Sequence, residues 1–240
     1  MKKSGREVFH GRFVVMRFGG NILKNMKHCK LIACRTLEDE LLSVIPEEMD
    51  YEFLDYALHD TPEILKQKLC EAFAADHDHN TILMGYGLCS NSVLGISSPR
   101  HRLVIPRVHD CISLLLGSRE RYDKEFSKVP ATFYLSEGWI KQKGDPYSAY
   151  LRNCERYGED MAMEFNQMLY ANYQRVAYIH TMDREQGDID YSKKVANFLQ
   201  VDFTELQGNM DLFRALVSGE WDERFIIVEP GQILEQKQFM

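Results

Sequence analysis

The sequence predicts an α/β protein made of two Rossmann-like parallel-sheet halves, which are related by an internal duplication and joined by a long helix. Short apolar runs alternate along the chain with segments of helical period, which is the pattern of parallel strands joined by helical crossovers. The segments Lys30–Gly87 and Arg175–Gly231 also share one order of elements: strand, helix, strand, helix, strand. This repetition predicts a duplication, and right-handed crossovers would place the strand ends of both halves at a shared cleft.

The first half, residues 28–146, carries clear helix-start signals. Thr36 can cap the helix after the first strand, and Thr61 followed by Pro62 places a cap and an early proline before the next one. The expected strands of this half are Lys30–Cys34, Tyr51–Tyr56, Thr81–Gly85, Arg102–Pro106 and Ala131–Leu135, and its expected helices include Glu63–Ala75 and Arg119–Lys128.

The second half, residues 147–240, opens on the long helical stretch Tyr147–Tyr173, whose apolar residues recur every three or four positions. We expect this stretch to be the helix that links the halves. The elements expected after it are the strands Arg175–Thr181, Asp202–Gln207 and Phe225–Val228 and the helices Tyr191–Leu199 and Met210–Ser218.

Composition narrows the class of protein. The chain has 240 residues, of which 45% are hydrophobic and 27% charged, as is usual for a soluble globular protein. A net charge of -7 argues against a nucleic-acid-binding face, which would need clustered basic residues. No apolar run approaches the ~20 residues that cross a bilayer, so we expect no membrane partner and a cytoplasmic location.

Residues 1–27 differ from the rest of the chain because they carry seven basic residues against a single acid, Glu7. Three interpretations stay open for this basic N-terminal extension. It is a loosely docked or disordered extension, the product of an upstream start codon chosen in error, or a basic arm that binds an acidic partner.

Three of the six cysteines follow apolar runs at matching places. Cys34 ends the first run, whereas Cys89 and Cys111 come shortly after two later ones. If these runs are parallel strands, all three thiols lie at the carboxyl edge of one sheet, where open α/β sheets bind ligands.

This convergence predicts a metal site formed by Cys34, Cys89 and Cys111, with His109 as a further ligand. Three thiolates suit an iron–sulfur cluster with one open iron, and three thiolates with an imidazole suit tetrahedral zinc. Two alternatives remain: the cysteines are small core residues, or one of them is a nucleophile paired with His109.

Other residues near these strand ends are candidates for binding and catalysis. His109 and Asp110 are the candidate catalytic pair. The loop that contains Gly85, Gly87, Ser90 and Asn91 offers backbone N–H groups and small polar side chains that can hold an anion.

Two further candidates have two interpretations each. Arg107 can pair with Asp110 or bind a substrate carboxylate. Trp139, which follows the fifth expected strand, can stack on a ligand or pack under the linking helix. Both are counted with the candidate cofactor-binding residues.

Several segments resemble one known family, the domain of unknown function family numbered sixteen thirty-eight. The segments that carry the resemblance are KLIACRTLEDEL, GYGLCSNSVLGI, LVIPRVHDCISLLLGSRERY, the pair Gly138-Trp139 and the late VEPGQ. The resemblance covers residues 30–231. It implies a protein of methanogens and anaerobic bacteria found near corrinoid-dependent methyltransferases, and thus a supporting role in methyl transfer. The DxHxxG pattern of corrinoid carriers is absent, because His109 is preceded by Arg107 and Val108.

The leading hypothesis is therefore a zinc or iron–sulfur protein that supports corrinoid-dependent methyl transfer in anaerobic one-carbon metabolism. The alternative is a non-catalytic accessory protein that docks on a methyltransferase or a corrinoid protein. Whether the chain is an enzyme is left open by the sequence.

Overall fold

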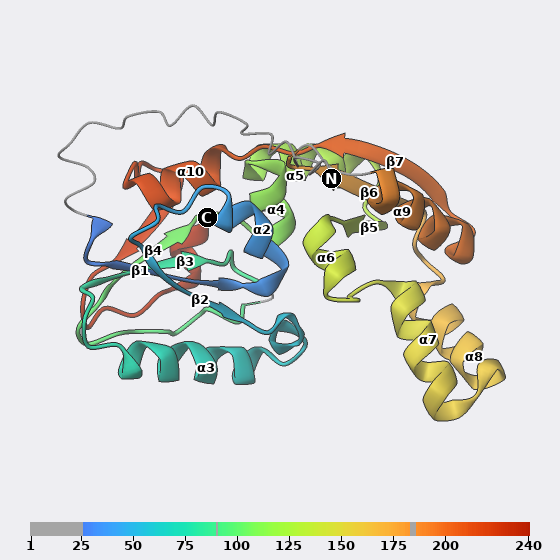
Figure 1. Cartoon of the computed structure of the whole chain (residues 1–240), viewed down its shortest axis with the longest axis horizontal. Coiled ribbons are helices and arrows are strands. Elements are labelled where there is room, and N and C mark those ends of the chain that lie inside the picture. Colours follow the sequence, from blue (N-terminus) through green and yellow to red (C-terminus); the bar gives the residue numbers. More distant parts are fainter. Residues whose placement is uncertain (1–25, 90, 183–185) are drawn as a thin grey trace, which may run out of the picture.

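The computed structural model describes residues 26–89, 91–182 and 186–240. Most of the predicted basic extension, residues 1–27, therefore lies outside the described residues. Within them the chain forms a mixed α/β structure with two sheets, as Figure 1 shows. We call the larger sheet with its covering helices the first lobe, and the smaller sheet with its helices the second lobe.

The elements of the chain are close to those expected from the pattern. The strands are β1 (Cys29–Cys34), β2 (Asp50–Leu54), β3 (Thr81–Gly85), β4 (Arg102–Pro106), β5 (Thr132–Leu135), β6 (Arg175–His180), β7 (Asp202–Gln207) and β8 (Phe225–Val228). The α-helices are α2 (Glu38–Leu42), α3 (Pro62–Ala75), α4 (Cys111–Leu116), α5 (Arg119–Lys128), α6 (Glu137–Lys141), α7 (Pro146–Tyr157), α8 (Glu159–Tyr170), α9 (Gln186–Leu199) and α10 (Asp211–Ser218). Short 3-10 helices cover Arg35–Leu37, Tyr56–Asp60 and Gln236–Phe239.

In the described residues the first lobe has the strand order β2-β1-β3-β4-β8. The first four strands are parallel, as predicted, and β8 pairs antiparallel with β4. The second lobe has the order β5-β6-β7, with all strands parallel. The second lobe is thus inserted between β4 and β8 of the first.

The predicted internal duplication is not confirmed. The last strand of the supposed second copy, β8, joins the first sheet, and β5, which the pattern placed in the first half, pairs with β6 of the second sheet. The physical reason is that β4 would otherwise be an uncovered edge strand, and an apolar strand such as β8 completes that edge.

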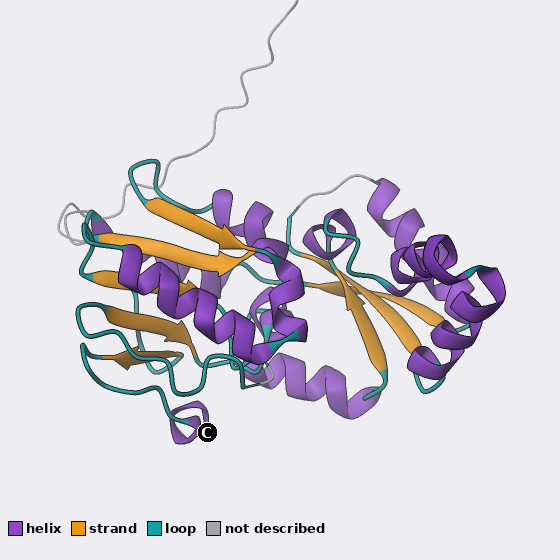
Figure 2. Cartoon of the chain, turned by 90° about the horizontal axis from the view of Figure 1, so that it is seen from below, coloured by secondary structure: helices purple, strands orange, loops and turns teal. Residues whose placement is uncertain are grey.

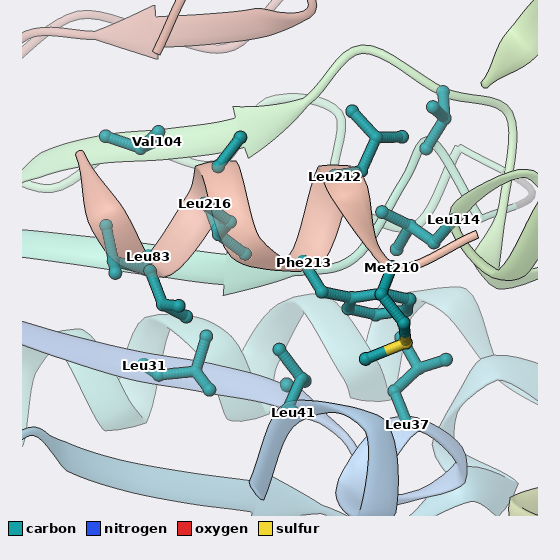
Figure 3. Packing of buried hydrophobic residues seen from close by; sticks show 14 of the residues in the cluster. Leu31, Leu37, Leu41, Leu83, Val104, Leu114, Met210, Leu212, Phe213 and Leu216 are labelled. Carbon is teal, nitrogen blue, oxygen red and sulfur yellow. The ribbon is translucent and has the colours of Figure 1, made fainter. Parts of the chain in front are cut away.

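Side chains alternate along the first sheet between two apolar layers. Leu31, Leu83 and Val104 face α10 and α4, where Phe213 and Leu216 pack against them (Figure 3). Their neighbours in sequence face α3 on the other side, in a cluster that contains Ile32, Leu65, Leu69, Phe73, Ile82, Met84, Leu103 and Ile105. Burial on both faces explains why these strands are continuous apolar runs.

The predicted linking helix is wrong in two respects, the first being that the stretch forms two helices, α7 and α8, that fold back on each other (Figure 1). They meet at Gly158, whose φ of 84° and ψ of 163° are accessible to glycine and not to other residues. Since the pair lies between β5 and β6, it belongs to a crossover of the second lobe and does not join the two sheets.

The parallel strands of both sheets point toward the middle of the molecule, whereas β8 runs in the opposite direction (Figure 2). Contacts between the lobes form there. Thr181 after β6 donates a hydrogen bond to the buried carboxylate of Glu40 on α2 at 2.7 Å. Lys141 at the end of α6 forms an ion pair with Asp39 at 3.0 Å. The carboxyl edges of the two sheets therefore face one another, as expected for strand ends that share a cleft.

Candidate functional site

A cavity of about 240 Å³ lies at the carboxyl edge of the first sheet. It is lined by Cys34, Gly85, Tyr86, Cys89, His109, Asp110, Cys111, Ile112 and Trp139. The three thiols that the sequence predicted to converge thus line one cavity. Seven of the nine lining residues were candidates from the sequence, and Tyr86 and Ile112 were not.

Cys34 reaches the cavity because it is the last residue of β1, a central strand of the sheet. Its side chain is buried, and its sulfur accepts a hydrogen bond from the hydroxyl of Thr36 at 3.1 Å. Thr36, which the sequence assigned as a helix cap, instead holds this thiol in place.

Cys89 and Cys111 are brought together by two loops that pair along their backbones. The N–H groups of Leu88 and Cys89 donate to the carbonyl oxygens of Val108 and His109 at 2.9 and 2.8 Å. Gly87 permits this approach, because a Cβ atom there would lie 2.8 Å from the carbonyl oxygen of Val108. Cys89 itself has a φ of 45°, in the left-handed region that few residues other than glycine adopt.

Burial keeps all three thiols in the protonated form. It raises the pKa of Cys89 to about 12 and raises the pKa values of Cys34 and Cys111 above the ordinary thiol value. The negative charge of Asp110 raises the pKa values of Cys89 and Cys111 further. The Trp139 side chain acts in the opposite direction and lowers the pKa of Cys111.

The two candidate catalytic residues have structural partners. His109 forms an ion pair with Asp123 of α5 at 3.3 Å, and its ring lies against Tyr122. Asp110 is the N-cap of α4, since its carboxylate accepts hydrogen bonds from the backbone and hydroxyl of Ser113 at 2.9 and 3.0 Å. Burial raises the pKa of Asp110, although these hydrogen bonds offset part of the rise.

Trp139 contributes to the wall of the cavity, and its stacking on a ligand stays a prediction. It lines the cavity, and it also packs edge-on against Tyr56 with ring centroids 6.2 Å apart. It is the one lining residue from the second lobe, on α6. The helix lies close to the first lobe because its Gly138 faces the carbonyl of Thr36, which a Cβ atom would approach to 1.9 Å.

A family model described as "Protein of unknown function (DUF1638)" matches residues 53–217, more than half of the chain. The chain belongs to this family. The matched region runs from within β2 to within α10, and so it contains Cys89 and Cys111 but not Cys34. No curated protein and no solved structure matches the chain.

Three of the expected cofactor-binding residues of this DUF1638 protein are not among those lining the cavity. Gly87 contributes indirectly, because it permits the close approach of the two loops that carry Cys89 and Cys111. Asn91, with a φ of 68°, shapes the turn after Cys89. Arg107 donates its backbone N–H to the carbonyl of Arg224 at 2.7 Å, and no ion pair joins it to Asp110 among the described residues. Ser90 lies outside the described residues.

The chemistry of the donors suits a metal, but the conformation is not that of a loaded site. Within residues 26–89, 91–182 and 186–240, no group of three or more His, Cys, Asp and Glu side chains is arranged to hold a metal ion. The three sulfurs are nevertheless soft donors on separate segments that share one cavity. Rotation about their Cα–Cβ bonds is the movement that changes the distances between them.

A second and larger cavity, of about 1160 Å³, lies at the carboxyl edge of the second sheet. Its lining includes His180 and Glu205, which form an ion pair at 2.9 Å, and Arg214 of α10. These residues could not be recognised from the sequence, because one histidine at a strand end and one acid within a strand form no recognisable motif.

In the part of this DUF1638 protein that the structure describes, no helix combines the length and apolar character needed to cross a membrane.

Proposed function

We propose that this DUF1638 protein binds a metal, as a zinc ion or an iron–sulfur cluster, through Cys34, Cys89 and Cys111. The observation that carries the proposal is that three thiols from three strand ends line one cavity of about 240 Å³. Isolated cysteines are usually small core residues, and Cys34 and Cys89 do pack in the apolar layer that faces α3, but such packing does not require three thiols to line one cavity. Zinc and iron–sulfur clusters are the centres that such sulfur-rich sites hold.

The surroundings of the thiols support metal binding that is coupled to loss of the thiol protons. All three have raised pKa values because of burial, so the metal must displace protons in order to bind. The hydrogen bond from Thr36 to Cys34 lowers the pKa of Cys34, and the Trp139 side chain lowers that of Cys111, so both favour the charged sulfurs that would result. Both side chains would act as outer partners that orient the ligands.

We infer a role in corrinoid-dependent methyl transfer in the cytoplasm of anaerobes, from the resemblance of the segments around the cysteines to proteins of that setting. A bound zinc would activate a thiol for methyl transfer, and a cluster would supply electron transfer or Lewis acidity. His109, which lines the cavity and pairs with Asp123, is the residue that we propose as general acid or base toward ligands there.

The test is anaerobic purification followed by elemental analysis and an absorbance spectrum. We expect either one zinc per chain or several irons with a brown colour, and we expect the metal to be lost in Cys89→Ser. Cys154→Ser is the matched control, because Cys154 lies on α7 and does not line the cavity. A wild-type protein that is colourless and free of metal after anaerobic purification would contradict the proposal.

A second candidate function is a non-catalytic accessory protein that docks on a methyltransferase or corrinoid protein. The observation that favours it is the apolar surface of the pair α7 and α8, where Met168 and Leu169 are 77% and 64% exposed. Flexible methionines are common on surfaces that bind partners. Under this alternative the Cys89→Ser variant would still bind the partner, whereas Met168→Glu would not.

A further inference from the structure

Tyr86 is the lining residue whose position suggests a specific task. It directly follows β3 and lies between two glycines that also belong to the site region, Gly85 and Gly87. Only 3% of its surface is exposed, and its hydroxyl has no hydrogen-bond partner among the described residues. The phenol thus brings a polar atom into a buried place without satisfying it.

An unsatisfied buried hydroxyl destabilises the folded protein, because it loses its hydrogen bonds with water and gains none in return. A phenylalanine would fill the same space without that cost. Among the described residues nothing satisfies the hydroxyl of Tyr86, which is therefore best explained by a bound partner. Since Tyr86 lines the cavity of about 240 Å³, that partner would bind in the cavity.

The electrostatic surroundings indicate what kind of partner this is. Tyr86 shares the lining of this cavity with Cys34, Cys89 and Cys111, so a ligand bound there would contact the sulfurs and the phenol together. No lysine or arginine lines the cavity in the described residues. A hydroxyl in these surroundings is best used as a donor to a negatively charged acceptor, because charge-assisted hydrogen bonds are the stronger ones.

Three sulfurs leave one position of a tetrahedral ion unfilled. The sequence assigned that position to His109, but the ring of His109 is engaged with Asp123 and Tyr122 on α5. The carboxylate of Asp110 is likewise engaged as the cap of α4. The cavity leaves room for a ligand of a few heavy atoms that comes from solution.

We propose that Tyr86 is a positioning residue whose hydroxyl donates a hydrogen bond to a small anionic ligand in the open position of a metal held by Cys34, Cys89 and Cys111. This inference rests on the proposed function, because it requires a metal in the cavity. It goes beyond that function in two ways. It assigns one coordination position of the metal to a ligand from solution, and it names a small anion as that ligand.

The experiment uses Co²⁺ as the metal and azide as the small anion. Binding of Co²⁺ to the full chain should produce an intense thiolate charge-transfer band in the near ultraviolet, and azide should then shift the visible bands. We expect Tyr86→Phe to keep the charge-transfer band but to bind azide about tenfold more weakly, as is typical when an outer partner of a ligand is lost. Tyr134→Phe is the matched control, since Tyr134 is a partly buried tyrosine of β5 outside the cavity.

The outcomes separate the two proposals. A wild-type protein without the charge-transfer band would contradict metal binding itself. A wild-type protein that shows the band but does not respond to azide, or equal azide affinities in wild type and Tyr86→Phe, would overturn the inference about Tyr86 and leave metal binding intact.

Thermal unfolding of the metal-free protein provides a second readout that does not depend on cobalt. If the hydroxyl has no partner in the empty protein, Tyr86→Phe should unfold at the same temperature as wild type or at a higher one. A lower unfolding temperature would show that the hydroxyl already has a structural partner, and would overturn the inference.

Discussion

The backbone N–H of Cys89 donates a hydrogen bond to the carbonyl oxygen of His109 at 2.8 Å. This bond ties the loop after β3 to the loop after β4, and so it sets the distance between Cys89 and Cys111. Side chains contribute nothing to the bond. The geometry of the candidate site therefore depends on how closely two backbones approach, and Gly87 is the residue that permits this approach.

Replacement of Gly87 by alanine should separate the two loops. The new Cβ atom would lie 2.8 Å from both the Asp110 nitrogen and the Val108 oxygen, and backbone atoms cannot yield as a flexible side chain can. We expect a loss of roughly 1–3 kcal/mol in the free energy of unfolding, measured with urea, as for other overpacked sites. Gly187→Ala on α9 is the control, because nothing lies within 4 Å of its Cβ position. Equal stability of the two variants would contradict the assigned role of Gly87.

Alkylation of Cys89 should be slow at neutral pH and should accelerate into the alkaline range. Burial raises its pKa to about 12, so the reactive thiolate stays a small fraction until the pH approaches that value. We expect the rate with iodoacetamide to rise about tenfold for each pH unit between 7 and 10. Peptide mapping by mass spectrometry measures each cysteine separately. A rate for Cys89 that levels off below pH 9 would show an accessible, activated thiol instead.

Thr181→Val should weaken the contact between the lobes. The Thr181 hydroxyl donates to Oε1 of Glu40, whose carboxylate is fully buried. Valine keeps the shape but removes the donor, so we expect a loss of roughly 1.5–3 kcal/mol in the free energy of unfolding, as for other hydrogen bonds to charged groups. Thr204→Val on β7 is the control, and a change of less than about 0.5 kcal/mol is expected there. If both variants unfold at the same urea concentration, the bond between the lobes does not stabilise the protein.

Acid should destabilise the protein through a buried network at the opposite edge of the first sheet. Burial alone would raise the pKa of Asp76, but hydrogen bonds from the backbone and ring of His79 and the charges of His79 and Lys30 outweigh it and lower that pKa. Burial lowers the pKa of His101, which lies 3.7 Å from Asp76. In both cases the unfolded chain binds protons more readily than the folded one, so stability falls as the pH drops below about 6.5 for His101 and below about 4 for Asp76.

Asp76→Asn tests this network. It should cost about 2 kcal/mol at pH 7, since the charge-assisted hydrogen bonds are lost, and it should flatten the decline in stability below about pH 4. Urea unfolding across pH 3–8 measures both effects. Asp202→Asn, at an exposed position on β7, should leave the pH profile unchanged. If the free energy of unfolding of Asp76→Asn falls with acid as steeply as that of wild type, Asp76 does not cause the acid destabilisation.

Much of the candidate site could be predicted from the sequence, because a thiol after an apolar run has a defined place once the run is a parallel strand. Cys34 ends β1, whereas Cys89 and Cys111 follow β3 and β4, and these strands are neighbours in the sheet. Tyr86 could not be recognised in the same way. A tyrosine between two glycines is common in turns, and only the packed cavity reveals that its hydroxyl has no partner among the residues that the structure describes.

The sequence by itself determined the elements, since each depends on contacts within a few residues. Apolar runs specify β1, β3 and β4, and the proline at the start of α3 marks where that helix begins. Tertiary structure decided which sheet each strand joins. The pattern of β8 is equally compatible with either sheet, and it joined β4 because α10 buries Phe213 and Leu216 against the first sheet and delivers the following strand to its open edge. The break at Gly158 was decided in the same way: the periodicity continues through it, and only packing of α7 against α8 selects the fold-back over one straight helix.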